Sequence, residues 1–419
     1  MSSYHRAFVA ACVLAPLFYV YWWRLTNHDR LGVFGGRISN EDVLNKTLGA
    51  QFSKIFVINL PSRTDRRDAM ALAGAVSNLS FTWIDGVSGD QVTDLTAPFS
   101  HEVRSPGSKG SWRSHMNALQ TIVKENLESA LILEDDIDWD IRLKPQLQTL
   151  ALASRTWLRE SKSDINLVRL LDFVPLSLQK DDDGTANIES KKDTIQLDPN
   201  MGADGRAYKS AYGDDWDVLW LGHCGTDFPS ENSEVNPLRI TIPEDPTVPA
   251  PKHLKPHPFA LLDKLGEIYP PHTRVVHASS GTICSLAYAI SYQGARKLLL
   301  KFNSHYDAQW DLMLQKWCEG GYTTKDKSQT KPDSNTNSKT TYENQEVPVC
   351  LTVQPPLFSH HYAKGGTSNI QGQGGGYTTA TGTPYIRLSV RENLKRLIAG
   401  APESEMIDQL PDNGKPIWK

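Results

Sequence analysis

The sequence predicts an α/β domain built on a mostly parallel central sheet. Short apolar runs rich in β-branched residues alternate with segments whose apolar residues recur at helical spacing, which is typical of strands joined by crossover helices. The chain has 419 residues and a hydrophobic share of 39%, enough for one large core or two smaller ones. The formal net charge of -4 argues against nucleic-acid binding through bulk electrostatics.

The N-terminus carries an uncharged apolar segment, residues 7–23, which is followed by Arg24. A membrane-spanning helix needs about 17 to 25 apolar residues, and the aromatic residues at the end of this segment suit a membrane interface. A cleaved signal peptide is the alternative interpretation. We expect a cytoplasmic tail over residues 1–6, a transmembrane signal-anchor and a polar stem over residues 24–51. The protein would then be a single-pass type II protein of the Golgi or endoplasmic reticulum membrane, with the bulk of the chain in the lumen.

Two features are compatible with a luminal position. Asn45 and Asn78 each begin an N-glycosylation sequon. The cysteines beyond the membrane segment have neither a CxxC nor a Cys/His zinc spacing, so structural zinc is not indicated. One or two disulfides are expected in an oxidising lumen, and the sequence leaves their pairing open. The cysteines concerned are Cys224, Cys284, Cys318 and Cys350.

One folded domain is expected over residues 52–400. Apolar, β-branched runs predict strands at residues 54–60, 80–90, 129–133, 216–222, 282–291 and 347–358. Helical spacing predicts helices at residues 63–76, 111–126, 292–302 and 307–317, with Ser111 as the N-cap of the second. Polar stretches at 178–213, 225–275 and 323–346 are interpreted as loop insertions, because strand-like segments resume after each one. Residues 401–419 are expected to form a C-terminal tail.

Carboxylates crowd the segment that directly follows a buried strand. In "SALILEDDIDWD", residues 129–140, acids occupy five of the seven positions from Glu134 to Asp140. If residues 134–138 are extended, Glu134, Asp136 and Asp138 share one face, because side chains alternate along a strand. Hard oxygen ligands at the carboxyl end of a strand predict a Mg²⁺ or Mn²⁺ site, at the edge where open α/β sheets bind ligands.

The acidic segment has two other interpretations, a calcium-binding loop and a solvated turn. An EF-hand loop fails, because counting from Asp136 places Ile141 and Leu147 where the loop requires Gly and Glu. A solvated acidic turn stays open as the structural alternative.

Five sequence blocks resemble, in their order, glycosyltransferase family 25, which includes bacterial lipooligosaccharide galactosyltransferases and collagen β-galactosyltransferases. The resemblance implies a GT-A-like fold, a UDP-sugar donor, often UDP-galactose, and inverting transfer to a glycan or glycoprotein hydroxyl. The sequence departs from the bacterial pattern at Ser111, where those members usually carry Cys, and its insertions leave the acceptor in doubt. The blocks are "KIFVINLPSRTDRR", "GSWRSHMNALQTIVKENLESALILEDD", "WDVLWLG", "SLAYAISYQGARKLL" and "VQPPLFSHH".

The resemblance also implies roles for the acids. Glu134, Asp135 and Asp136 would hold a divalent cation, Mn²⁺ or Mg²⁺, that bridges the diphosphate of the nucleotide-sugar donor. Asp136 and Asp138 spell the D-x-D pattern of GT-A enzymes, so the register of the metal ligands stays open. A late histidine completes the metal site in many such enzymes. One of the pair His360 and His361 is the candidate, with His360 chosen, and a surface histidine pair is the alternative.

Basic side chains follow the first strand. Arg63, Arg66 and Arg67 carry guanidinium groups that could bind the donor phosphates, and an ordinary basic helix face is the alternative. Asn59 lies in the same family block and is expected on the donor side as well. A bound cation and these groups would stabilise the charge that develops on the leaving nucleoside diphosphate.

An inverting transfer needs a general base for the acceptor hydroxyl. Asp311 matches an acidic position that the family carries in a late helix, and we prefer it to Asp307, with a helix-surface acid as the alternative. His115 is interpreted as a core histidine that orients the neighbouring acids. Two further functions stay open, a catalytically inactive relative that binds glycans or partners and a metal-dependent phosphoesterase.

Overall fold

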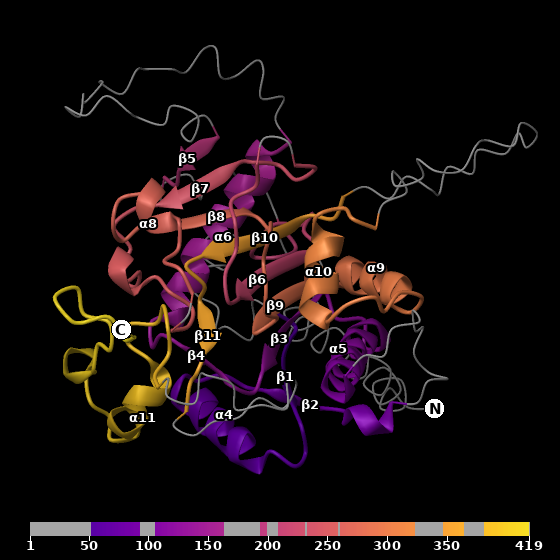
Figure 1. Cartoon of the computed structure of the whole chain (residues 1–419), viewed down its shortest axis with the longest axis horizontal. Helices are drawn as coiled ribbons and strands as arrows, with labels where there is room; N and C mark the ends of the chain where they lie inside the picture. Colours follow the sequence, from indigo (N-terminus) through magenta and orange to yellow (C-terminus); the bar gives the residue numbers. More distant parts are fainter. Residues whose placement is uncertain are drawn as a thin grey trace, which may run out of the picture.

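The computed structural model shows helices on both sides of one large sheet (Figure 1). The predicted tail, anchor and stem over residues 1–51 and the predicted insertion 323–346 lie outside the described residues. Within the described part of the chain, no helix is long and apolar enough to cross a membrane. The structure describes residues 52–92, 105–162, 193–198, 208–230, 233–258, 260–322, 347–363 and 381–418.

The sheet contains 11 strands in the described ranges, and nine of them follow the order β2-β1-β3-β9-β6-β10-β8-β7-β5. Strand β11 pairs with β6 and β4 beside this path. The strands are β1 Lys54–Asn59, β2 Thr82–Asp85, β3 Ser129–Glu134, β4 Ile137–Trp139, β5 Thr194–Gln196, β6 Val218–Gly222, β7 Arg239–Ile242, β8 Arg274–Ala278, β9 Ala287–Ser291, β10 Cys350–Gln354 and β11 Phe358–His360.

The sheet is mixed, so the prediction of a mostly parallel sheet was wrong. Strand β1 runs parallel to β2 and β3, but β9 lies antiparallel between β3 and β6, and β8 lies antiparallel between β10 and β7. Residue patterns predicted the segments of β1, β2, β3, β6, β9 and β10, but neither their directions nor the strands β4, β5, β7 and β8. The region 225–275, interpreted as a loop insertion, contributes β7 and joins it to β8 without the long crossover helix that a parallel connection usually contains.

The helices begin where local capping allows. Helix α5 begins at Pro106 rather than near Ser111, because Ser105 accepts a hydrogen bond from the backbone N–H of Ser108 and proline suits the first turn. The predicted N-cap at Ser111 was therefore wrong. The helices are α4 Thr64–Val76, α5 Pro106–Lys124, α6 Leu143–Glu160, α8 Leu265–Ile268, α9 Tyr292–Phe302, α10 Trp310–Cys318 and α11 Val390–Ile398, with short 3₁₀ turns η1 Gly89–Gln91, η4 Pro251–His253 and η6 Glu403–Glu405.

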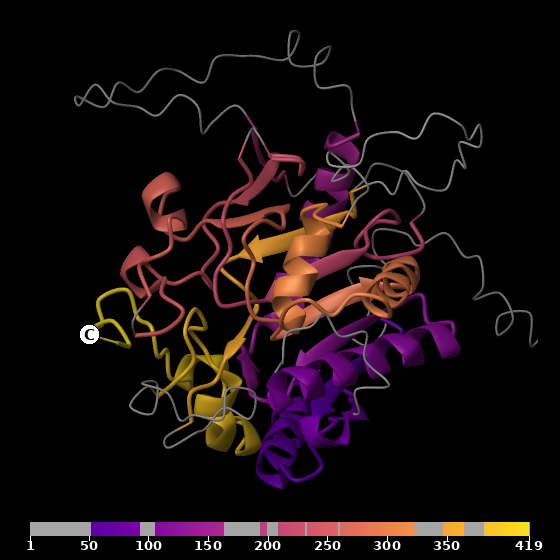
Figure 2. The ribbon, with the colours of Figure 1, turned by 45° about the vertical axis from the view of Figure 1, so that its right-hand side comes forward.

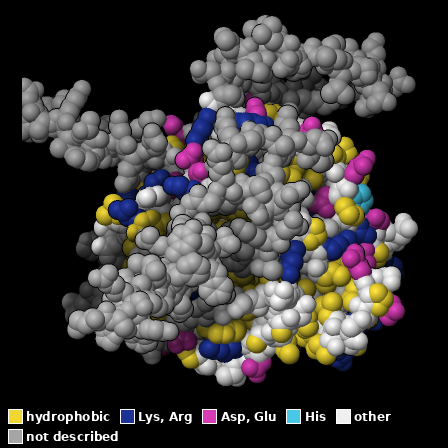
Figure 3. Space-filling model, turned by 180° about the vertical axis from the view of Figure 1, so that it is seen from behind, with side chains coloured by type: hydrophobic (Ala, Val, Ile, Leu, Met, Phe, Trp, Pro, Cys, Tyr) yellow, Lys and Arg dark blue, Asp and Glu magenta, His cyan; other side chains and the backbone are white. Residues whose placement is uncertain are grey.

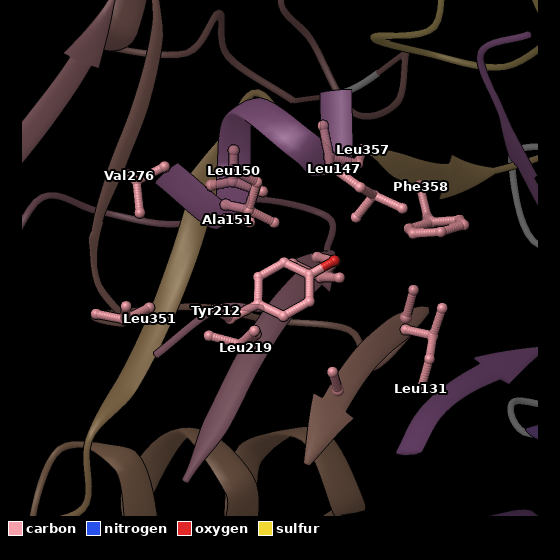
Figure 4. Close-up of a cluster of buried hydrophobic side chains, with 14 of the residues drawn as sticks. Leu131, Leu147, Leu150, Ala151, Tyr212, Leu219, Val276, Leu351, Leu357 and Phe358 are labelled. Carbon is pink, nitrogen blue, oxygen red and sulfur yellow. The ribbon is translucent and has the colours of Figure 1, made fainter. Parts of the chain in front are cut away.

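Alternate residues of the strands fill two cores. In β3, Leu131 and Leu133 pack with Leu147 and Leu150 of α6, and Figure 4 shows part of this cluster around Tyr212. The intervening residues of β3 pack on the other side, against α5, α9 and α10 (Figure 2). This alternation is what a strand buried on both faces requires. On the back of the molecule, charged side chains of both signs are interspersed with apolar ones where described residues are visible (Figure 3).

The carboxyl ends of four strands meet at one edge of the sheet. Strands β1 and β3 are parallel, β3 and β6 are both antiparallel to β9, and β10 is parallel to β6. Their last residues, Asn59, Glu134, Gly222 and Gln354, therefore lie along the same edge. Ligands of open α/β sheets usually bind at such an edge.

Two disulfides, whose pairing the sequence left open, are present among the described residues. Cys224–Cys284 joins the segment after β6 to the segment before β9, and Cys318–Cys350 joins α10 to β10. The first of these bonds lies beside the strand edge described above.

The C-terminal segment, residues 381–418, packs against the domain, and α11 lies beside α4 and β4 (Figure 1). Residues 401–418, predicted as part of a tail, are held by specific contacts. The side-chain amide of Gln409 donates to the carbonyls of Thr383 and Ile386, and Leu410 is fully buried. This segment therefore contributes to the folded body and lies close to the acidic residues.

Candidate functional site

The acidic segment forms a turn. Strand β3 ends at Glu134, Asp135 and Asp136 form the turn, and β4 begins at Ile137. The extended conformation considered for residues 134–138 does not occur, because the chain turns here so that β4 can pair with β11. The acids consequently point to different partners rather than to one shared ligand.

Arg66 bridges the two acids of the turn. Its Nη1 donates to Oδ1 of Asp135 at 2.6 Å and to Oδ2 of Asp136 at 2.8 Å. Asn59, the last residue of β1, donates from Nδ2 to the other oxygen of Asp135 at 2.7 Å. Burial lowers the pKa of Arg66, but the charges of Asp136 and Asp135 outweigh it and raise that pKa. Four of the predicted site residues thus lie in contact, because the parallel strands β1 and β3 end side by side.

Asp136 keeps one oxygen without a hydrogen-bond partner. This atom, Oδ1, is buried, accepts no hydrogen bond from the described residues and lies 3.5 Å from Nδ1 of His360. Burial raises the pKa of Asp136, but His360, Arg66 and Arg391 outweigh it and hold the pKa far below its usual range. Asp136 is therefore a charged carboxylate. Its Oδ1 is available to a ligand, because it accepts no hydrogen bond and lies next to the imidazole of His360.

Glu134, the last residue of β3, has a raised pKa. Burial, reinforced by the charge of Asp136, raises the pKa of Glu134 to about 8, and Ser285 donates to its Oε1 at 2.8 Å. His115 lies 3.9 Å from the same oxygen, and burial lowers its pKa to about 3. The ring of His115 stacks on Trp310 at 4.7 Å, so His115 lies in the core, as predicted.

Asp138 holds the C-terminal segment. Its Oδ1 accepts from the backbone N–H groups of Trp139 and Arg391, and its Oδ2 accepts from the hydroxyls of Thr383 and Ser389. A carboxylate has about four lone-pair positions, and these four donors occupy them. The geometry therefore gives no support to the predicted role of Asp138 as a metal ligand.

Arg63 and Arg67 lie along the start of α4 and have partners other than the acidic turn. Arg63 forms a bidentate pair with Asp65, at 2.8 and 2.7 Å. The guanidinium of Arg67 lies 4.5 Å from the ring centre of Trp83. Of the three predicted arginines, Arg66 is thus the one that contacts Asp135 and Asp136.

Asp311 lies in the first turn of α10 and faces the segment that precedes β9. Its Oδ2 accepts a hydrogen bond from the backbone N–H of Cys284 at 2.9 Å. Cys284 has a positive φ of 64° and is bonded to Cys224. The next residue is Ser285, which donates to Glu134. One short segment therefore connects the predicted general base to the acidic turn.

The predicted three-carboxylate metal site is not supported. No group of three or more His, Cys, Asp or Glu side chains in the described ranges is arranged to hold a metal ion. Asp136 and His360 nevertheless fit as two ligands, since one has an unpartnered buried oxygen beside the other's ring nitrogen. Hard cations are commonly bound through one or two carboxylates together with substrate phosphates. The side chains fit a cation that a bound diphosphate helps to hold.

The C-terminal residues that contribute to the site were not predicted from the sequence. Ser389 caps α11 and bonds Asp138, and Arg391 contacts the acidic turn although it is 253 residues away from Asp138 along the chain. The local pattern "SVRE" is a capping signal for the helix. No signal in the sequence indicates which acids that helix contacts.

The comparisons with known proteins agree with the predicted family. Residues 52–208 match the family described as glycosyltransferase family 25 (LPS biosynthesis protein). Over 112 residues the chain is 32% identical to procollagen galactosyltransferase 1-B of Xenopus laevis, across 24% of this chain and 18% of that relative. It is 26% identical over the same length to procollagen galactosyltransferase 2 of Homo sapiens, with the same two coverages.

A further match has a different functional description. The chain is 26% identical over 112 residues to the inactive glycosyltransferase 25 family member 3 of Homo sapiens, across 24% of this chain and 19% of that relative. The chain thus spans less than a fifth of these curated relatives. The predicted resemblance to family 25 is confirmed for residues 52–208, whereas Asp311, His360 and Arg391 lie beyond that segment.

Replacing Asp138 by alanine should lower the free energy of unfolding by about 3 kcal/mol or more, because buried donors lose their acceptor. Urea denaturation of the purified full chain measures this change. Asp68→Ala removes an exposed acid on α4 and should change stability by no more than about 0.5 kcal/mol. Equal stability of Asp138→Ala and Asp68→Ala would contradict the role assigned to Asp138.

Proposed function

We propose, from the family 25 segment at residues 52–208, that this chain is a glycosyltransferase. It transfers a sugar, most simply galactose from UDP-galactose, to a hydroxyl of a glycan or glycoprotein, with inversion. Galactose is chosen because two of the matched relatives are described as procollagen galactosyltransferases. The mixed α/β sheet with its site at the carboxyl edge is consistent with the GT-A-like fold that the resemblance implies.

The observation that carries this proposal is the arrangement of Arg66, Asp136 and His360. A guanidinium, a charged carboxylate with an unpartnered oxygen and an imidazole lie together where the strands end. Asp136 and His360 would hold a divalent cation, Mn²⁺ or Mg²⁺, which supplies positive charge to the leaving diphosphate when bound. Arg66 holds the Asp136 carboxylate in place and adds positive charge at the same position.

Asp311 is the proposed general base. It accepts a hydrogen bond from the backbone at Cys284 through Oδ2, which fixes the direction of the carboxylate. In an inverting transfer, a carboxylate on the acceptor side takes the hydroxyl proton as the sugar carbon is attacked from the opposite face. Asp307 is less suitable, because Lys316 and Tyr322 already bond both of its oxygens.

An inactive relative that binds a glycan or a partner is the second candidate. It is favoured by the match to an inactive family member and by the ion pairs that Arg66 already forms with both turn acids. The two candidates differ in turnover. An inactive relative would retain a glycan in a pull-down but release no nucleotide from any sugar donor.

Asp136→Ala should reduce sugar transfer from UDP-galactose by about a hundredfold or more, because the proposed cation loses its charged ligand. Release of UDP by the purified full chain with Mn²⁺ measures the rate, and EDTA should abolish it. Asp68→Ala is the control and should behave as the wild type. A rate that is unchanged by EDTA and by Asp136→Ala would contradict the metal assignment.

Asp311→Asn should lower kcat by about 10²- to 10⁴-fold, since the amide cannot take the acceptor proton. Asp307→Asn is the matched control, because it changes a nearby aspartate of the same segment that binds Lys316. The two variants are compared in kcat and in KM for the donor. If Asp307→Asn loses turnover and Asp311→Asn keeps it, the assignment of the base is wrong.

The proposed location is the lumen of the Golgi or endoplasmic reticulum, behind the anchor predicted at residues 7–23. In support, the sequon residue Asn78 is exposed after the end of α4, in a left-handed turn with a φ of 53°. A glycan on Asn78 would project into solvent without displacing packed side chains.

When the chain is expressed in glycosylating cells, endoglycosidase treatment should increase its mobility, and Asn78→Gln should remove part of that shift. Asn126 is a matched control, since it is exposed and has the same φ of 53° but begins no sequon. Asn126→Gln should leave the shift unchanged. The luminal location fails if the chain carries no glycan and protease digests the domain from the cytosolic side of intact membranes.

A further inference from the structure

Arg391, on the C-terminal helix α11, binds the backbone on both sides of Asp136. Its Nε donates to the carbonyl of Ile137 at 2.8 Å, and its Nη2 donates to the carbonyl of Asp135 at 3.1 Å. Its backbone N–H also donates to Asp138 at 3.2 Å. A planar guanidinium fork can hold two carbonyls at once, which the single ammonium of lysine cannot do with the same geometry.

The remaining carbonyl of the turn is held as well. The backbone N–H of His361 donates to the carbonyl of Asp136 at 2.8 Å. Three consecutive carbonyls, at residues 135, 136 and 137, thus have fixed donors. Arg66 holds one oxygen of the Asp136 side chain from the other side of the site. The direction of the remaining oxygen is therefore set by α4, the segment after β11 and α11 together.

The position of Arg391 is itself anchored. Ser389, the N-cap of α11, donates to Asp138, and the backbone N–H of Leu388 donates to Asp140 at 3.0 Å. Asp140 also forms a bidentate pair with Arg142, at 2.7 and 2.8 Å. These contacts bring a helix near the C-terminus to the acidic turn and keep it there.

We propose that Arg391 is a positioning residue of the donor site and that the C-terminal segment 381–418 completes this site. Arg391 fixes the turn so that the available oxygen of Asp136 faces His360. This inference rests on the proposed function, because it assigns the reason for the geometry of Asp136. It also implies that the segment matched to family 25, residues 52–208, is not sufficient for donor binding.

Arg391→Gln should lower kcat for sugar transfer by tenfold or more and raise the KM for the UDP-sugar. Lys395→Gln is the matched control, because it removes a cation from an exposed position on the same helix and should keep wild-type kinetics. Thermal unfolding of both variants must show that they are folded at the assay temperature. Arg391→Lys should restore only part of the rate, and added guanidinium ion should partly restore Arg391→Ala. Wild-type kinetics in Arg391→Gln would overturn the proposal.

A second measurement does not depend on activity. Hydrogen exchange of the full chain should be faster in Arg391→Gln at residues 134–139 and at the amide of His361, while Lys395→Gln should match the wild type. Equal exchange in both variants would overturn the inference even in an active enzyme. If exchange changes as expected but the wild-type chain releases no nucleotide from any sugar donor, the proposed function fails and the positioning of the turn stands.

Discussion

The structure depends on neutralising the negative charge that follows β3. Five of the seven residues from Glu134 to Asp140, at the end of the buried strand β3, are acids. Carboxylates in a protein interior are tolerated only when they are paired or hydrogen-bonded. The partners are Arg66 from α4, Arg142 from the start of α6 and the hydroxyls of Thr383 and Ser389. The nearby charge of Arg391 from α11 also lowers the pKa of Asp136. Because these partners come from distant parts of the sequence, neutralising the charge also joins those parts into one body.

Each acid of this segment has a role that depends on the groups bound to its carboxylate. Asp138 and Asp140 are fully bonded and hold the C-terminal segment, while burial raises the pKa of Glu134 to about 8. Asp135 is bonded through both oxygens, by Arg66 and Asn59. Within the described turn, Asp136 is the acid whose buried oxygen has no hydrogen-bond partner. Among the buried carboxylate oxygens of this turn, Oδ1 of Asp136 is thus the one that can accept a ligand.

The family segment supplies only part of this site. Residues 52–208 contain β1, α4, β3 and the acidic turn, but His360, Asp311 and Arg391 come later in the chain. The Cys224–Cys284 segment contacts Asp311, the pairing of β11 with β4 places His360, and α11 carries Arg391 to the acidic turn. The surroundings of Asp136 are therefore formed in part by residues outside the segment that matches the family.

Local patterns in the sequence determined several strands of the sheet and part of the candidate site. Apolar, β-branched runs identified β1, β3 and β6, and the family blocks brought Asn59, Arg66, Asp135 and Asp136 to one site, because parallel neighbouring strands end together. The tertiary structure alone decided the antiparallel direction of β9, the turn after β3, the pairing of the disulfides and the contact of Arg391 with that turn. These features depend on residues far apart in the chain, and such contacts are chosen by packing and charge pairing in the folded state, which no local pattern records.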